Sequence, residues 1–427
     1  MPGHEQRSCD EYVPDRPVAI TPRLMKFHPR HPVILLRSSW QSVNIGDIAH
    51  TPGLLRVLQR FYPQAEVVLW PCNLGHGAEE MLRHHFPALQ IVKGELNSEG
   101  KPDNETLAAL WDRADFFLHG SGPGMVQSSA ASAWNRLTGK SFGFFGVTTD
   151  SPRPEHVEVA SRADFVLTRE TTSLLHLQQA GLRGVAIEFC PDATFACDLR
   201  NDTLGDQCLV EEGLQEGRFV CMVPRLRYTP RHIVYNKPRT TEDAERDAVN
   251  DQYAQKDHAK MREAIVRVVR ETDMCVFLCP EMTYQLDLMD DLLFDPLPSD
   301  VKSRVRIRRR YWLPDEASSV YARAASVVSF ECHSPILALR QGTPVIHLRQ
   351  PTDTIKGQMW RDVGLADYLL EIDEVSGADI AEVLLAQLLD SPKARANMRQ
   401  ALEYADARME QGARLVERSC ISSRQGS

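Results

Sequence analysis

The chain has 427 residues, more than a single hydrophobic core usually accommodates, so its length predicts two or three domains. Its 49 basic and 58 acidic residues give a net charge of −9, which argues against nucleic acid as a main partner. The longest apolar runs are strand-sized, far below the roughly 20 residues of a membrane-spanning helix, so no transmembrane segment is expected.

Residues 1–30 are rich in proline, histidine and charge, and they lack the apolar stretch of a secretory signal, so we expect a flexible extension. The ten cysteines are scattered, and several lie in apolar segments where free thiols pack as small hydrophobic groups. Cys275 and Cys279 share one predicted strand without a second ligand pair, so no metal site is expected. These features predict a cytoplasmic protein with reduced cysteines.

Strands and helices alternate over residues 31–205, which we interpret as the first domain. The segments between the strands carry apolar residues three and four positions apart, as in Leu54, Leu55, Leu58 and Phe61. Near-continuous apolar strands with such helices predict a parallel sheet that is covered on both faces. The expected strands are Val33–Leu36, Ala65–Trp70, Leu89–Val92, Ala114–Leu118, Ser141–Phe145, Ala163–Leu167 and Val185–Phe189.

A polar, acidic segment over residues 198–217 interrupts this alternation and is interpreted as a linker. A second series predicts another domain over residues 215–375, and residues 376–427 are expected to form a helical tail. The expected strands are Arg218–Val223, Met274–Leu278, Val305–Arg308, Ser326–Phe330 and Pro344–Leu348. Two Rossmann-like domains whose parallel sheets face a cleft, followed by a helical tail, form the GT-B type of α/β architecture, in which ligands bind in the cleft.

Two glycine-containing turns follow strands of the first domain. The turn Asn44-Ile-Gly-Asp47 precedes the first helix, where it can bind an anion or simply cap the helix. In His119–Gly124 three glycines alternate, which indicates close approach of a ligand or of another chain segment, but not the dinucleotide pattern. The candidate substrate-binding residues in these turns are Asn44, Gly46, Asp47, Ser121 and Gly122, each with a purely structural alternative.

Polar residues also follow strands of the second domain. Arg225 and Arg227 come after the first strand, and a planar guanidinium can hold a carboxylate or phosphate through two hydrogen bonds. Glu281, Tyr284 and Gln285 follow the next strand and belong to the same edge of the sheet. We therefore expect an anion site formed by the arginines, with the other three as further substrate-binding candidates.

The segment from Ser329 to Ile346 is the most informative in the chain. A strand leads into Glu331 and His333, and a helix is predicted to begin at Ser334-Pro335 and end at Gly342. A second strand follows, so the segment predicts a parallel crossover with its carboxyl-terminal edge at Glu331 and His333.

Glu331 and His333 are the candidate catalytic residues. Because they are two positions apart, they share a face if the segment is extended, and the carboxylate can then orient the imidazole. Histidine titrates near neutrality and can transfer protons. The alternative is a pair bonded only to local backbone. Arg349 and Lys356, near the end of the next strand, can supply cations to the same cleft.

Taken in order, these motifs resemble the polysaccharide pyruvyl transferase family from about Val33 to Leu370. The resemblance rests on Asn44–Asp47, His119–Gly124, Thr168–Ser173, Ala180-Gly181, Pro191–Phe195, Pro224-Arg225, and His333 with Ala338, Gly342 and Pro344. It implies a GT-B fold and transfer of the enolpyruvyl part of phosphoenolpyruvate to two hydroxyls of a sugar, with no other cofactor. It also implies Arg225 as the donor's anion anchor and His333 as the acid or base.

The chain departs from the family at one position. The family usually carries Arg-Leu-His where this chain has Glu331-Cys332-His333, and a carboxylate there is expected to repel phosphoenolpyruvate. Either Arg225, Arg227, Arg349 or Lys356 supplies the missing charge, or the donor differs.

Two alternatives to pyruvyl transfer remain open at this point. The first is a GT-B glycosyltransferase or related nucleotide-sugar enzyme, in which Glu331 meets hydroxyls of the donor. The second is a catalytically silent homologue that binds a glycan. In each case the expected partner is a sugar or glycan, lipid- or nucleotide-linked, and the protein can be an oligomer.

Overall fold

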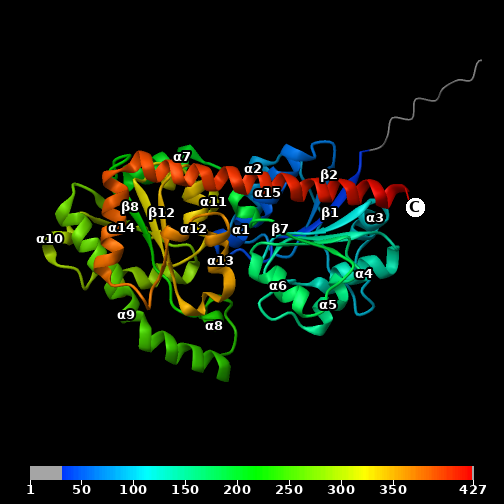
Figure 1. The fold of residues 1–427 in the computed structure, drawn as a ribbon, viewed down its shortest axis with the longest axis horizontal. Helices are drawn as coiled ribbons and strands as arrows, with labels where there is room; N and C mark the ends of the chain where they lie inside the picture. Colours follow the sequence, from blue (N-terminus) through cyan, green and yellow to red (C-terminus); the bar gives the residue numbers. More distant parts are fainter. Residues whose placement is uncertain (1–30, 426–427) are drawn as a thin grey trace, which may run out of the picture. The chain divides into compact units, whose positions relative to one another are not determined.

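The structure is a computed structural model that describes residues 31–425; the predicted N-terminal extension over residues 1–30 lies outside the described residues. From Pro32 onward the described chain forms one compact unit. Each half of this unit is built on a parallel β-sheet, as the sequence predicts (Figure 1).

The first sheet has seven parallel strands in the order β3-β2-β1-β4-β5-β6-β7. Alternate residues of β1 enter two different cores: Ile34 and Leu36 pack with α1, whereas Val33 and Leu35 pack with α3 and α4. This is why the strand is apolar from Val33 to Leu36. The strands are β1 Val33–Ser38, β2 Glu66–Pro71, β3 Gln90–Ile91, β4 Phe116–His119, β5 Phe142–Val147, β6 Phe165–Thr168 and β7 Ala186–Phe189.

The second sheet has six parallel strands in the order β10-β9-β8-β11-β12-β13. All five strands expected in this half are present. A sixth, short strand, β13, was not predicted, because polar residues flank it in the sequence. The strands are β8 Phe219–Val223, β9 Cys275–Leu278, β10 Val305–Ile307, β11 Ser326–Ser329, β12 Val345–Arg349 and β13 Leu369–Glu371.

Helices cover both faces of each sheet (Figure 1). Those of the first half are α1 Ile45–Phe61, α2 Ala78–His85, α3 Glu105–Arg113, α4 Ser128–Thr138, α5 Pro154–Ala160 and α6 Thr171–Gln179, followed by the 3₁₀ turn η1 Ala193–Ala196. Those of the second half are α8 Arg231–Val234, α9 Thr241–Glu271, α10 Ser299–Lys302, α11 Pro314–Ala322, α12 His333–Arg340, α13 Gln358–Asp362 and α14 Gly377–Leu389, with the short helical turns η2 Thr283–Asp287, η3 Met289–Phe294, η4 Pro351–Gly357 and η5 Ala366–Tyr368.

The linker predicted over residues 198–217 is wrong, because its centre forms helix α7, Asp202–Glu212. The Asn201 side chain accepts a hydrogen bond from the backbone N–H of Leu204 and so begins the helix. Cys208 is buried, and α7 packs against α11 of the second half. The polar composition that suggested a linker belongs to the exposed face of this helix.

The helical tail is confirmed, and it contains α14 and the long helix α15, Ser391–Gln425. Helix α15 contacts α12 and α14 in the second half, and it contacts α1, β4 and β5 in the first (Figure 1). The tail therefore joins the two halves. Within residues 31–425, no helix is both long enough and apolar enough to cross a membrane.

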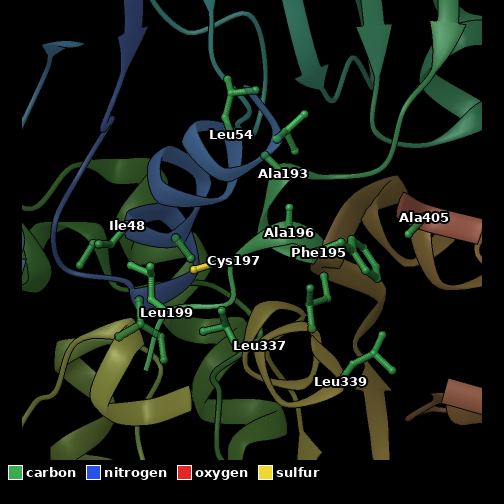
Figure 2. Packing of buried hydrophobic residues seen from close by; sticks show 14 of the residues in the cluster. Ile48, Leu54, Ala193, Phe195, Ala196, Cys197, Leu199, Leu337, Leu339 and Ala405 are labelled. Carbon is green, nitrogen blue, oxygen red and sulfur yellow. The ribbon is translucent and has the colours of Figure 1, made fainter. Parts of the chain in front are cut away.

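A buried apolar cluster lies where α1, η1, α12 and α15 meet, and we call it the junction core. Figure 2 shows Leu54 of α1, Phe195 of η1, Leu337 of α12 and Ala405 of α15 within it. Because α1 and η1 belong to the first half and α12 to the second, this core holds the first residues of α1 and α12 near each other.

Candidate functional site

A cavity of about 470 Å³ lies between the two halves, at the carboxyl-terminal edges of the sheets. The first half contributes Trp40, Gln41, Asn44, Asp47, Pro123, Thr148 and Arg169. The second half contributes Arg225, Arg227, Tyr228, Thr229, Arg231, Tyr235, Arg246, Met282, Glu331, His333, Thr352, Thr354 and Lys356. Six of these side chains are cationic arginine or lysine, so the cavity suits an anionic ligand.

His333 is the first residue of α12 and reaches the cavity wall although it is only 4% exposed. Its Nδ1 lies 3.4 Å from Oε1 of Glu281, and its Nε2 lies 3.7 Å from Oδ2 of Asp192. Glu331 does not contact this ring: the chain turns into the helix at His333, so the two residues do not share the face of an extended segment. The predicted orienting role of Glu331 is therefore wrong, and Asp192 and Glu281 fill it.

The environment of His333 favours its protonated form. Burial opposes the charge, but Cys332, Asp192 and Glu281 outweigh burial and raise the pKa of His333 well above its usual value. Burial likewise tends to raise the pKa of Asp192, yet His50 and Arg169 hold this pKa well below its usual range. An imidazolium between two carboxylates is a positioned proton donor.

Asp192 is held by several groups besides His333. Its Oδ2 accepts a hydrogen bond of 2.5 Å from Nη1 of Arg169, and its Oδ1 accepts one of 2.9 Å from the backbone N–H of Thr194. The hydroxyl of Ser121 donates to the carbonyl oxygen of Gly146 and lies 3.3 Å from Oδ1 of Asp192. Ser121 thus supports the carboxylate from behind, rather than lining the cavity.

His50, Asp192 and His333 are close enough together to be considered as ligands of a metal ion. However, Arg169 donates to the same oxygen of Asp192 that faces both imidazoles. A guanidinium at 2.5 Å already supplies the positive charge that this carboxylate needs. The donor set therefore fits an ion-paired network better than a metal centre.

A second network surrounds Arg225. Its Nη1 lies 2.9 Å from Oδ1 of Asp353 and donates at 3.0 Å to the amide oxygen of Gln350. Its Nε lies 3.4 Å from Oε2 of Glu331. Lys356 lies 3.8 Å from the same oxygen of Asp353. Two cations thus meet two acidic groups at the base of the cavity.

The two acids of this network differ in their protonation. Burial raises the pKa of Glu331 to about 8, although the nearby Arg225 opposes the rise. Burial also disfavours ionised Asp353, but Arg225 and Lys356 overcome it and hold the pKa of Asp353 below its usual range. Near neutral pH, Glu331 is therefore mostly a neutral carboxylic acid, whereas Asp353 is a carboxylate.

Arg227 and Arg349 are engaged elsewhere. Arg227 borders the cavity, but its guanidinium pairs with Asp257 and Asp373. Arg349 lies outside the cavity lining, where it pairs with Glu371 at 2.8 Å. The structure thus brings Arg225 and Lys356 together in the cavity and leaves Arg349 in a separate ion pair.

The turn before α1 has a capping role. The side-chain oxygen of Asn44 accepts hydrogen bonds from the backbone N–H groups of Gly46 and Asp47, so Asn44 is the N-cap of α1. Asn44 and Asp47 also line the cavity. A Cβ at Gly46 would lie 2.3 Å from Cγ of His333, so only glycine leaves room for the ring.

In the second glycine turn, Gly122 faces the ring of Trp40. A Cβ atom at position 122 would lie 2.6 Å from Nε1 of that ring. Gly120 and Gly122 thus admit another chain segment, one of the two alternatives that the pattern left open.

Glu281, Tyr284 and Gln285 lie behind the cavity wall. Glu281 accepts a 2.6 Å hydrogen bond from the backbone N–H of Ser334, and Gln285 donates at 2.8 Å to Oε1 of Glu331. The Tyr284 hydroxyl accepts from the backbone N–H of Leu226. These residues orient the groups that line the cavity.

Sequence reasoning did not select Arg169, Asp192, Asp353 or His50 as site residues. The segments Thr168–Ser173 and Pro191–Phe195 each follow a strand of the first sheet, which was the available signal for Arg169 and Asp192. Asp353 lies between Arg349 and Lys356 after β12 and carried the same signal as they did, whereas His50 lies within α1 and carries no comparable signal.

A family model described as polysaccharide pyruvyl transferase matches residues 44–350, more than half of the chain. The chain belongs to the polysaccharide pyruvyl transferase family. The matched segment runs from the turn before α1 to the end of β12, so it leaves out β1 and β13, and it includes every predicted site residue except Lys356. Membership confirms the predicted enzyme class, a transferase.

Solved structures of GT-B type share the fold. E. coli ADP-heptose lipopolysaccharide heptosyltransferase II has a TM-score of 0.51 at 13% identity, over 84% of this chain and 99% of its own. Anabaena Alr3699/HepE in complex with UDP-glucose has a TM-score of 0.53 at 13% identity, over 91% of this chain and 100% of its own. A UDP-N-acetylglucosamine 2-epimerase has a TM-score of 0.57 at 16% identity, over 91% of this chain and 95% of its own. No curated protein matches the chain in sequence.

Proposed function

We propose that this member of the family transfers the pyruvyl group of phosphoenolpyruvate to two hydroxyls of a sugar acceptor in glycan biosynthesis. The observation that carries the proposal is the position of His333, an imidazole between Asp192 and Glu281 at the wall of a cation-lined cavity. The acceptor is a nucleotide- or lipid-linked sugar, and the reaction takes place in the cytoplasm.

The chemistry needs a proton donor and fixed positive charge. Two sugar oxygens bond to C2 of the donor, its methylene carbon takes a proton and becomes a methyl group, and the C2–O bond to phosphate breaks. We assign the proton to His333. Arg169, Arg225 and Lys356, which line the same cavity, stabilise the carboxylate and the departing phosphate.

Glu331 is compatible with an anionic donor when it is protonated. With its pKa raised to about 8, the carboxyl group carries little charge near pH 7 and can donate a hydrogen bond to a phosphate or carboxylate oxygen. The repulsion expected of an ionised Glu331 thus applies only at higher pH. Arg225 and Lys356 then supply the positive charge for the donor.

A nucleotide-sugar donor is the second candidate. It is favoured by the carboxyl group of Glu331 at the cavity wall, which can accept hydrogen bonds from sugar hydroxyls, and by the exposed ring of Tyr235 at the cavity edge. One structural neighbour is described in complex with UDP-glucose.

Phosphate release from phosphoenolpyruvate, measured with a panel of nucleotide- and lipid-linked sugars, tests the proposal. We expect acceptor-dependent release that His333→Asn lowers by at least about 100-fold. His258→Asn is the matched control, because His258 is equally buried but lies outside the cavity lining. Consumption of a nucleotide sugar without use of phosphoenolpyruvate would support the second candidate. Sugar binding without turnover would indicate a silent homologue.

A further inference from the structure

His50 is a fully buried histidine that the proposed reaction has not yet used. It lies on α1 with 0% exposure, and neither of its ring nitrogens has a hydrogen-bond partner among the described residues. Burying polar atoms costs free energy unless neighbouring groups compensate them, and each nitrogen of this ring faces a carboxylate at ion-pair distance.

The His50 ring lies between two carboxylates, one at the cavity wall and one beside His333. Its Nε2 is 3.2 Å from Oδ2 of Asp192, and its Nδ1 is 3.6 Å from Oδ1 of Asp47, which lines the cavity. The same oxygen of Asp192 faces Nε2 of His333 at 3.7 Å. Asp47, His50, Asp192 and His333 therefore form a row, which we call the proton row, with both ends at the cavity wall.

The row is held rigidly by separate elements. Asp47 and His50 are one turn apart on α1, Asp192 caps η1, and His333 begins α12. All three elements pack in the junction core (Figure 2). The titratable groups around the row include Arg169, bound to Asp192, Cys332 and Glu281 beside His333, and Tyr235 and Tyr311 near Asp47. Distances of 3.6–3.7 Å exceed those of hydrogen bonds, and catalytic contacts commonly shorten when substrate binds.

We propose that His50 relays a proton from Asp47 through Asp192 to His333 and thereby reprotonates His333 in each catalytic cycle. The inference rests on the proposed function, since it is the donor's methylene carbon that removes the proton from His333. It assigns His50 a positioning and relay role rather than direct contact with substrate.

The protons balance over one cycle. Each sugar hydroxyl loses one proton as its oxygen bonds to C2 of the donor. One of these protons leaves with phosphate. The other passes to Asp47 and along the proton row to His333, which replaces the proton given to the methylene carbon. No oxidant, reductant or further reactant is required.

Transient kinetics of phosphate release test the relay. In His50→Gln the first turnover uses the proton already on His333, so we expect a burst of about one phosphate per site near the wild-type rate. Later turnovers should be at least about 10-fold slower, so that kcat and KM fall together while kcat/KM stays near the wild-type value. His258→Gln, a buried-histidine control, should show no burst. A slow first turnover with a raised KM would mean that His50 only supports the structure.

A second measurement does not depend on turnover. In protein labelled with ¹⁵N-histidine, we expect the ring signals of His50 and His333 to change over the same pH interval, and Asp192→Asn to separate their responses. Signals of His50 that stay constant while His333 titrates would overturn the relay, even if phosphoenolpyruvate proves to be the donor. Loss of activity with a chelator, restored by Zn²⁺, would assign the residues to a metal site instead and would also overturn it.

Discussion

At the scale of single residues, the unusual feature is Glu331, an acid beside the arginine that we assign to donor binding. Its Oε2 lies 3.4 Å from Nε of Arg225, and burial raises its pKa to about 8. Arg225 already pairs with Asp353, and a neutral Glu331 adds no second negative charge beside it, whereas an ionised Glu331 competes with an anionic ligand for the guanidinium.

The affinity for phosphoenolpyruvate should therefore depend on pH. Glu331 is neutral below its pKa and charged above it, so we expect affinity to fall as pH rises from about 7 to 9. Glu331→Gln cannot ionise and should bind the donor almost equally at both pH values. Calorimetric titration measures the difference. Wild-type affinity that is independent of pH over this interval would contradict the account.

Arg225 serves both stability and binding, and the two roles can be separated. Arg225→Met removes the main partner of buried Asp353, so we expect a loss of about 3–5 kcal/mol in the free energy of unfolding. Adding Asp353→Asn removes the uncompensated charge and should restore most of this stability, but not donor binding. Denaturant unfolding and donor titration of both variants provide the measurements. Donor affinity that recovers along with stability would show that Arg225 is only structural.

Arg225, Glu331 and His333, which were selected as residues that follow strands, all line the cavity, because the strand ends of a parallel sheet share one edge. Their partners could not be predicted in the same way. Asp192 and His333 are far apart in the sequence and meet only through the packing of η1 and α12, and which buried acid stays neutral depends on that packing.

At the scale of elements, the start of α1 determines where His333 lies. Gly46 is the second residue of α1, and a Cβ there would clash with the His333 ring. Alanine is otherwise about 0.5–1 kcal/mol better than glycine within a helix. The clash should outweigh this preference only while the ring is present.

A double-mutant cycle tests this contact. We expect Gly46→Ala to lower both activity and the free energy of unfolding in the wild-type background. In the His333→Ala background the same change should be neutral or stabilising. The measurement is equilibrium unfolding of the four proteins. An equal effect of Gly46→Ala in both backgrounds would mean that Gly46 and His333 are not in contact.

Element prediction succeeded where apolar periodicity was strong and failed where it was masked. Strand β8 is apolar throughout and β1 is apolar from Val33 to Leu36, and both were located within one or two residues. Helix α7 presents a mainly polar surface and buries only a few side chains, so its sequence resembled a linker. Helix α12 begins at His333, before the predicted start at Ser334-Pro335, and the backbone N–H of Ser334 is bound by Glu281 from the loop after β9.

At the scale of the molecule, the cavity requires both halves. Backbone hydrogen bonds link the turn before α1 to the loop after β9, with the N–H of Ile45 donating to the oxygen of Glu281 at 3.0 Å. The junction core and α15 hold the same two halves together. The sequence predicted two parallel sheets and a cleft, but it could not predict that α15 would contact both.

The identity of the donor is the central claim, and ligand-induced thermal stabilisation tests it most directly. A ligand that binds only the folded protein must raise its unfolding midpoint. At pH 7 we expect phosphoenolpyruvate to raise the midpoint of the wild-type protein but not that of the Arg225→Met/Asp353→Asn variant. A shift with UDP-glucose alone, and none with phosphoenolpyruvate, would contradict the account.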